Sequence, residues 1–117
     1  MTHLSVITPT YNEEESILKC IVRLRQVMQE SFPEMSYEHL IIDNSSSDNT
    51  ADIAIKESIS DSRVKVIVNS RNIGASRSIY RALARVQGAW IIPMLPADLQ
   101  DPVEVIPLML NHNYIIV

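Results

Sequence analysis

The sequence predicts a single α/β domain built on an open, mainly parallel sheet with flanking helices. Short apolar, β-branched segments of strand length alternate with segments whose apolar residues follow helical spacing. Each strand segment ends in polar residues that are common in turns. The chain of 117 residues is 46% hydrophobic, which is enough for one packed core, and no repeat or linker divides it.

The first half of the chain predicts two strands with a helix between them. Residues Leu4–Thr8 form a strand that ends before a proline, because proline has no N–H for the ladder. Asn12 and Glu15 have the spacing of a capping box, so the helix is expected to begin at Asn12 and to run to about Glu30. Tyr37–Asp43, with Leu40, Ile41 and Ile42 at its centre, is the second strand.

The second half continues the alternation. Ser47 or Asp48 is expected to cap a second helix, and Val64–Val68 is the third strand. A third helix is expected to stop at Gly88, which would take the position just after the helix end. Ala89–Leu95 then reads as a fourth strand, in which a proline requires an edge, a bulge or a position whose N–H would face solvent.

The last residues predict a short helix and a further strand. Asp101 has the position of an N-cap and Pro102 that of the first helical residue. Tyr114–Val117 reads as a fifth strand. A strand at the end of the chain leaves an exposed sheet edge, so we expect a homo-oligomer or a tendency to aggregate.

Composition excludes several classes of function. The net charge of −4, with Lys and Arg scattered singly, argues against a nucleic-acid partner. The lone cysteine, Cys20, excludes a disulfide framework and favours burial in a reducing, cytoplasmic setting. No apolar run reaches the length of a transmembrane segment, and no signal peptide is expected at the start.

Four polar loops are expected to meet at one edge of the sheet. Right-handed crossovers place the carboxyl ends of parallel strands together, and ligands bind along that edge where the strand order reverses. Taken singly, each side chain has a structural explanation, such as a helix cap for Asp101. Their convergence favours a binding site. The four loops are Pro9–Glu13, Asp43–Thr50, Arg71–Arg77 and Pro96–Asp101.

The ordered set of motifs resembles a known family. Pro9–Glu14, Asp43–Thr50, Arg71–Gly74 and Ala97–Pro102 together resemble the family-two inverting glycosyltransferases of the GT-A fold. The Asp-Leu-Gln-Asp-Pro run at Asp98–Pro102 looks most like the branch that makes polyprenyl- or dolichyl-phosphate sugars. The resemblance covers essentially the whole chain, and it implies a nucleoside-diphosphate sugar as donor and a polyprenyl phosphate or a glycan as acceptor.

The resemblance also implies roles for individual residues. Asp98 would bind Mg²⁺ or Mn²⁺ against the diphosphate, with Asp101 as a second candidate ligand, because these ions prefer carboxylate and phosphate oxygens. Tyr11 would flank the base and Asp43 would accept a hydrogen bond from it. Arg71 or Arg77 would clamp the phosphates. The full set implied for nucleotide binding is Pro9, Tyr11, Glu13, Asp43, Asn72, Gly74, Arg77 and Ala97. No catalytic residue is identified.

Three positions depart from the family pattern. Asn44 stands where a second aspartate is usual, Asn49 stands where a glycine is usual, and Pro96 replaces the first aspartate of Asp-x-Asp. Proline offers no side-chain ligand, so the metal position is impaired or rearranged. Two other interpretations therefore stay open: a non-catalytic nucleotide-sugar-binding or scaffold domain, and a generic doubly wound nucleotide binder.

The resemblance also bears on how much of an enzyme this chain represents. Family members continue into an acceptor-binding half that holds the catalytic base, so residues 1–117 are expected to be the donor-binding part, truncated before that half. His112 is interpreted as a turn residue rather than as that base. The expected location is cytoplasmic, with the inner face of the membrane as an extension of that expectation.

Overall fold

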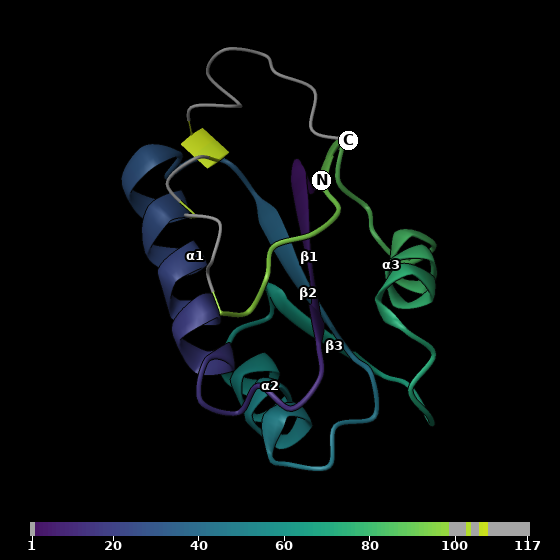
Figure 1. Ribbon diagram of the computed structural model, residues 1–117. Coiled ribbons are helices and arrows are strands. Elements are labelled where there is room, and N and C mark those ends of the chain that lie inside the picture. The colour runs from purple at the N-terminus through teal and green to yellow at the C-terminus, as the bar shows by residue number, and fades with distance from the viewer. Residues whose placement is uncertain (1, 99–102, 104–105, 108–117) are drawn as a thin grey trace.

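A computed structural model describes residues 2–98, 103, 106 and 107. Within these residues four parallel strands form one sheet in the order β3-β2-β1-β4. Helices α1 and α2 cover one face and α3 lies on the other (Figure 1). The predicted fold class is therefore confirmed. The elements are β1 Leu4–Thr10, α1 Ile17–Ser31, β2 Tyr37–Asp43, α2 Thr50–Ser60, β3 Val64–Val68, α3 Ala75–Leu83 and β4 Trp90–Ile92.

The strand order reverses beside β1. The chain moves outward from β1 to β2 and then to β3, and α3 carries it back across the sheet to the other side of β1. β1 pairs with β2 along its whole length, from Leu4 opposite Tyr37 to Thr10 opposite Asp43. Pairing with β4 covers only Leu4–Val6. The carboxyl end of β1 therefore borders the point where the two halves of the sheet diverge, where open α/β sheets bind ligands.

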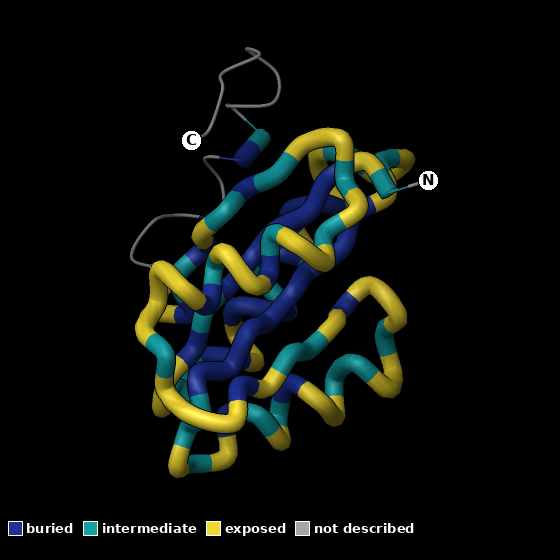
Figure 2. Tube along the Cα trace, turned by 90° about the vertical axis from the view of Figure 1, so that its right-hand side faces the viewer, coloured by how far each residue is buried: buried dark blue, intermediate teal, exposed yellow. Residues whose placement is uncertain are grey.

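Apolar side chains fill both layers beside the sheet, and Figure 2 shows the buried strands running through the centre. On the α1 side, Leu4 and Val6 pack with Cys20 and Leu24. Cys20 is fully buried, as expected, and burial raises the pKa of its thiol to about 12. On the α3 side the buried residues come from β1, β2 and α3: Ile7, Leu40, Ile42 and Ala82.

β1 runs through Pro9 to Thr10, two residues beyond the predicted end at Thr8. The carbonyls of His3 and Ile7 accept hydrogen bonds from the N–H groups of Trp90 and Leu95, so odd-numbered residues of β1 face β4. Pro9 shares that orientation. Its missing N–H therefore faces the β4 side, beyond the last paired residue of β1, and costs the β1–β2 ladder nothing.

The predicted helix ends were wrong in two places. α1 begins at Ile17 with Ser16 at the N-cap, because Asn12 has a φ of 52° and its side chain bonds to another loop. α3 ends at Leu83, so Gly88 is no helix stop. A Cβ on Gly88 would lie 2.6 Å from the backbone nitrogen of Ser5, so close packing against β1 requires the glycine.

Two further predictions concern α2 and β4. The predicted cap of α2 was wrong, because Asn49 rather than Ser47 or Asp48 takes the N-cap position. The carboxylate of Asp48 instead accepts hydrogen bonds from the N–H and hydroxyl of Thr50, the first residue of the helix. β4 covers only Trp90–Ile92 and is shorter than the predicted strand Ala89–Leu95. It ends before Pro93, because proline has no N–H for the ladder. The predicted helix at Pro102 with its Asp101 cap, the strand Tyr114–Val117 and the turn at His112 lie outside the described residues.

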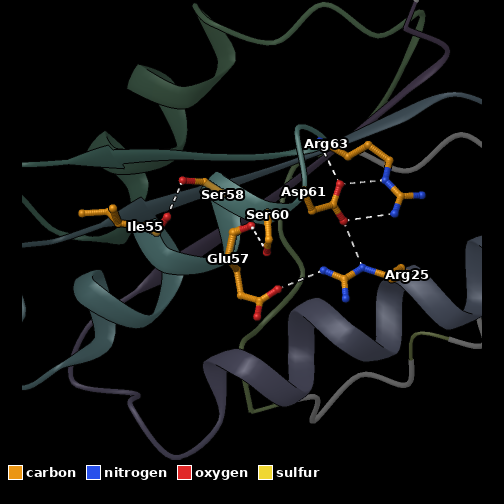
Figure 3. A network of polar contacts seen from close by, with 7 residues as sticks. All are labelled: Arg25, Ile55, Glu57, Ser58, Ser60, Asp61 and Arg63. Atoms are coloured by element: carbon orange, nitrogen blue, oxygen red, sulfur yellow. Dashed lines mark hydrogen bonds and ion pairs between the residues drawn. The ribbon is translucent and has the colours of Figure 1, made fainter.

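Charged side chains connect the elements at the end of the sheet opposite the carboxyl ends of the strands. Arg25 of α1 donates to Glu57 and Asp61, both at 3.0 Å, and so joins α1 to the end of α2 (Figure 3). Arg63 bonds the same Asp61 carboxylate and lies 5.0 Å above the ring of Tyr37. These contacts hold the scaffold on the side away from the carboxyl ends of the strands.

Candidate functional site

The loops after β1 and β2 are locked together by the side chain of Asn12. Its Oδ1 atom accepts hydrogen bonds from the N–H groups of Ser47 at 2.8 Å and Asp48 at 3.4 Å, and from the Ser47 hydroxyl at 3.2 Å. Its own N–H donates to Ser46 Oγ at 2.8 Å. The positive φ of Asn12 turns the side chain toward the second loop, a conformation that asparagine tolerates well.

Asp43 ends β2 and is completely buried. Its Oδ1 atom accepts hydrogen bonds from the hydroxyls of Thr10 at 2.8 Å and Ser46 at 2.6 Å. Its Oδ2 atom accepts the N–H of Ser46 at 2.9 Å. The carboxylate therefore organises the two loops, and its predicted contact with a nucleotide base stays a prediction.

A network of amide side chains ties the Arg71–Gly74 loop to the end of β2. Asn44 donates from Nδ2 to Asn72 Oδ1 at 2.7 Å, and its Oδ1 accepts the N–H of Ile73 at 2.8 Å. Asn72 Oδ1 also accepts the N–H of Gly74 at 2.9 Å. Gly74 has a φ of 85°, so glycine is needed there for its backbone conformation. The departure at Asn44 thus supplies a donor that a carboxylate would lack.

Glu13 and Asp98 are electrostatically coupled across the point where the strand order reverses. Burial raises the pKa of Glu13, and the negative charges of Asp98, Asp43 and Asp48 raise it further, whereas the N–H of Tyr11 acts in the opposite direction. The N–H of Glu13 is held by Thr50 Oγ1 at 2.8 Å. This site therefore gathers carboxylates from the loops after β1, β2 and β4.

The remaining predicted residues differ in how accessible they are. Tyr11 is 48% exposed at the end of β1, and Arg77 is exposed in the first turns of α3. Pro9 is half-buried within β1. Ala97 is buried against Ile17 and the apolar residues around it. Any contact of Ala97 with a ligand would therefore use its backbone.

A divalent metal fits the donor chemistry around Asp98 only in part. Asp98 is exposed, and its negative charge already disfavours ionisation of Glu13, a repulsion that a cation would relieve. Pro96 contributes no side-chain ligand. In the described part of the chain no three His, Cys, Asp or Glu side chains form a group suited to a metal ion. Asp101, the second candidate ligand, lies outside the described residues.

Several residues that shape this site were missed by sequence reasoning. Asn12 was interpreted as a helix cap, and Asn44 as the loss of an acidic residue. Thr10 and Ser46, which hold Asp43, were not singled out. The signal was the density of Asn, Ser and Thr in these loops, because such side chains bond to nearby backbone groups.

The helices of the described residues offer no candidate for a membrane-spanning segment. None of them combines the length and the apolar character that crossing a bilayer requires.

Comparison with proteins of known sequence finds relatives that are named as glycosyltransferases or sugar transferases. A glycosyltransferase from Bacillus subtilis of unassigned activity, YkcC, is 38% identical over 107 residues, which cover 92% of this chain and 32% of the relative. The undecaprenyl-phosphate 4-deoxy-4-formamido-L-arabinose transferase of Salmonella choleraesuis is 39% identical over 105 residues, 89% of this chain and 31% of the relative. The chain thus spans about a third of the length of these curated relatives.

Solved structures share the fold. The mannosyltransferase PcManGT from Pyrobaculum calidifontis, determined with GDP-Man and Mn²⁺, superposes with a TM-score of 0.72 at 18% identity, covering 92% of this chain and 32% of that protein. S. aureus TarS residues 1–349, determined with UDP-GlcNAc, gives a TM-score of 0.72 at 24% identity, covering 96% of this chain and 32% of that one. Both neighbours support the GT-A fold.

The family itself follows from a direct match. The family described as glycosyl transferase family 2 matches residues 5–113, which is nearly the whole chain. This range includes all four loops that meet at the carboxyl edge of the sheet. The chain belongs to glycosyl transferase family 2.

Proposed function

We propose that this chain is the donor-binding part of a glycosyltransferase that moves a sugar, with inversion, from a nucleoside diphosphate to a polyprenyl phosphate. The observation that carries the proposal is the hydrogen-bonded meeting of the loops after β1, β2 and β3 beside the point where the strand order reverses, where open α/β sheets bind ligands, in a chain that matches glycosyl transferase family 2. The relative from Salmonella choleraesuis is named as an undecaprenyl-phosphate transferase, which supports a lipid phosphate over a glycan as acceptor. A lipid phosphate is already anionic and needs no base to make it a nucleophile.

The binding roles of the loops follow from their positions. Tyr11 offers an exposed ring for stacking against a base, and Arg77 offers an exposed guanidinium for a phosphate. Asn72 and Gly74 form the surface beneath the nucleotide, held in place by Asn44. Asp43 either positions the loop that contacts the base or accepts a hydrogen bond from the base itself. Its Oδ2 atom accepts one hydrogen bond, from the N–H of Ser46, and can accept a second.

Asp98 is proposed as the residue of this chain that holds Mg²⁺ or Mn²⁺. A bound ion would neutralise the diphosphate leaving group as negative charge develops on it. Glu13 lies close enough to Asp98 for their charges to interact, so a cation would also stabilise its ionised form. The neighbour PcManGT was determined with Mn²⁺, which supports a divalent ion of this kind.

Calorimetric titration of the folded chain with UDP, GDP and their sugars, with and without Mn²⁺, tests the proposal. We expect weak nucleotide binding that Mn²⁺ strengthens. Asp98→Ala is expected to abolish the Mn²⁺ effect, whereas Glu30→Ala, a matched change at the exposed end of α1, leaves it intact. Absence of binding to every nucleotide by a folded sample would contradict the proposed function.

The second candidate is a non-catalytic nucleotide-sugar-binding or scaffold domain. Pro96, where the family has a metal-binding aspartate, is the observation that favours it. Nucleotide binding that needs no metal and survives Asp98→Ala would support this candidate. A gain of Mn²⁺ affinity in Pro96→Asp would instead mean that the geometry of a two-carboxylate site is retained.

The proposed reaction also suggests where the protein acts. A nucleotide-sugar donor is a water-soluble metabolite, and a polyprenyl phosphate lies in a membrane. A cytoplasmic protein that works at the inner face of the membrane meets both. Fractionation of cells that express the tagged protein checks this location.

A further inference from the structure

The basic side chains of this chain are distributed unevenly. Residues 62–97 contain six of the ten Lys and Arg residues and none of the 14 Asp and Glu residues. Four of the six are arginines in or next to α3, although the whole chain has a net charge of −4. The segment that carries α3 is therefore strongly cationic, and the rest of the chain is strongly anionic.

The arginines of α3 gather on its outer side. Arg77 and Arg81 are exposed in α3 and spaced by four residues, close to one helical repeat, and the exposed Arg85 follows in the turn just after the helix. The buried Ser78 and Ala82 mark the inner side of the helix. Among the helices of the described residues, α3 is the one on its face of the sheet (Figure 1), and Figure 2 views the molecule from that side.

Within the part of the chain that the structure describes, these arginines differ from those on the other face in having no recorded carboxylate partner. Arg25 and Arg63 form ion pairs with Asp61. Across the described residues, by contrast, neither Arg77 nor Arg85 bonds to a carboxylate, and the recorded contact of Arg81 is with the neutral Asn69 Oδ1 at 2.7 Å. Their charges are available to an anionic partner.

An aromatic ring lies among these charges. Tyr80 is 75% exposed and directly precedes Arg81 in α3. We define Arg77, Tyr80, Arg81 and Arg85 as the α3 arginine face. Arginine binds phosphate through paired N–H donors, and tyrosine favours the boundary between headgroups and acyl chains. This combination is typical of protein surfaces that lie on anionic membranes.

We propose that the α3 arginine face binds the surface of an anionic lipid bilayer. A flat anionic surface contacts one face of the protein and leaves the acidic remainder in water. The proposal deepens the proposed function, on which it rests, because a polyprenyl-phosphate acceptor lies within such a surface. Contact through α3 would hold the carboxyl edge of the sheet near the membrane, since α3 begins directly after the Arg71–Gly74 loop.

Vesicle flotation of the 117-residue chain tests the proposal. The vesicles are phosphatidylcholine alone or an equimolar mixture with phosphatidylglycerol, without polyprenyl phosphate or nucleotide. We expect binding only to the anionic vesicles, and weaker binding as salt increases. Since acceptor and donor are absent, failure here leaves nucleotide titration as a separate test of the proposed function.

Two matched double variants separate the α3 face from net charge. Arg77→Gln with Arg85→Gln is expected to weaken binding about 25-fold, since each arginine near an anionic surface contributes roughly fivefold. Lys19→Gln with Lys56→Gln makes the same change in net charge at exposed positions of α1 and α2, and is expected to keep binding near that of the unmodified chain. Equal losses in both variants would overturn the proposal.

The contribution of the ring is tested separately. Tyr80→Ser is expected to weaken vesicle binding by an amount that salt does not change, because its contribution is apolar. The proposal would be overturned if the unmodified chain bound neutral vesicles as well as it binds anionic vesicles. It would also be overturned if the unmodified chain preferred a poly-glutamate peptide to the anionic vesicles. The latter result would assign the face to an acidic protein partner. Circular dichroism of each variant verifies that it is folded.

Discussion

At the residue scale, His39 is a histidine that the fold keeps uncharged. It is buried in β2, where its Nε2 atom lies 2.7 Å from Thr8 Oγ1 and its Nδ1 atom has no partner among the described residues. Burial lowers the pKa of His39 to about 3, and the positive charge of Arg25 adds to this. Below pH 6.5 the unfolded chain therefore binds a proton at this residue that the folded chain does not.

The consequence is a loss of stability as the pH falls from 6.5 toward 3. We expect His39 to contribute a slope of about 1.4 kcal/mol in unfolding free energy per pH unit. His39→Gln removes this contribution, whereas His3→Gln, at an exposed position, preserves the slope. Urea unfolding at several pH values measures both. An unchanged slope in His39→Gln would show that other groups cause the acid sensitivity.

Ser45 offers a second test at a single position. It has a φ of 63°, a left-handed conformation that costs a residue with a side chain roughly 1 kcal/mol. Ser45→Gly is therefore expected to raise the unfolding free energy by up to about 1 kcal/mol. Ser70→Gly, at an exposed loop position outside the left-handed region, is expected to lower it slightly. Parallel denaturation curves compare the two, and a loss of stability in Ser45→Gly would refute the strain.

Single residues were predicted from the sequence when one role was available to them, and mispredicted when two roles competed. Cys20 is apolar in character and was correctly placed in the core. Asn12 suits either an N-cap or a left-handed turn, and only its contact with Ser47, 35 positions away, decides between them. Local spacing carries no information about such a distant partner.

At the scale of elements, the amide network explains how the loops are kept in register. Asn44 uses both its donor and its acceptor, toward Asn72 and Ile73. Asn44→Asp would keep the acceptor and place a carboxylate against the Oδ1 atom of Asn72. We expect a loss of about 1–3 kcal/mol in unfolding free energy, the usual effect of leaving a buried polar group unsatisfied.

A matched change separates geometry from charge. Asn49→Asp adds the same negative charge at an exposed N-cap without a side-chain hydrogen bond, where the helix dipole favours it, so we expect no loss of stability. Thermal unfolding compares the two variants. If Asn44→Asp were as stable as Asn49→Asp, the network would not be what holds the Arg71–Gly74 loop.

The strands were easier to predict than the ends of the helices. β2 and β3 have the predicted bounds, because the Leu-Ile-Ile run of β2 and the valine-rich β3 have the composition of parallel strands. α3 ends five residues before Gly88, because Gly88 serves packing against Ser5 rather than helix termination. A glycine in a sequence does not reveal which of these two requirements it meets.

At the scale of the whole molecule, the sheet edge bears on self-association. β4 is the last strand on its side within the described residues, and Met94 beyond it is 51% exposed. Exposed apolar edges pair with other copies. We expect concentration-dependent association by light scattering, reduced in Met94→Lys. Ile59→Lys, a similar change on α2 at a residue that is 83% exposed, leaves the association unchanged. A monodisperse monomer at high concentration would count against this expectation.

The architecture was predictable as a whole because alternating strands and helices allow few topologies. The family resemblance of the four loops gave the family correctly, which a match over residues 5–113 confirms. The cationic side of α3 was not anticipated. Arg77 and Arg81 are separated in the sequence, and only the helix brings them to one side, with Arg85 in the turn that follows.

The hydrogen bond between the N–H of Gly88 and Ser5 Oγ has a consequence for the order of folding. It joins residues 83 positions apart, and the nearby pairing of β4 with β1, from Leu4 opposite Trp90, spans a similar separation. Closing such a long loop is entropically expensive, whereas β1, β2 and β3 assemble through shorter connections. The β1–β2–β3 unit is therefore expected to form first, and β4 to dock last. The carboxylate of Asp98 follows β4, so the candidate site is completed only in that final step.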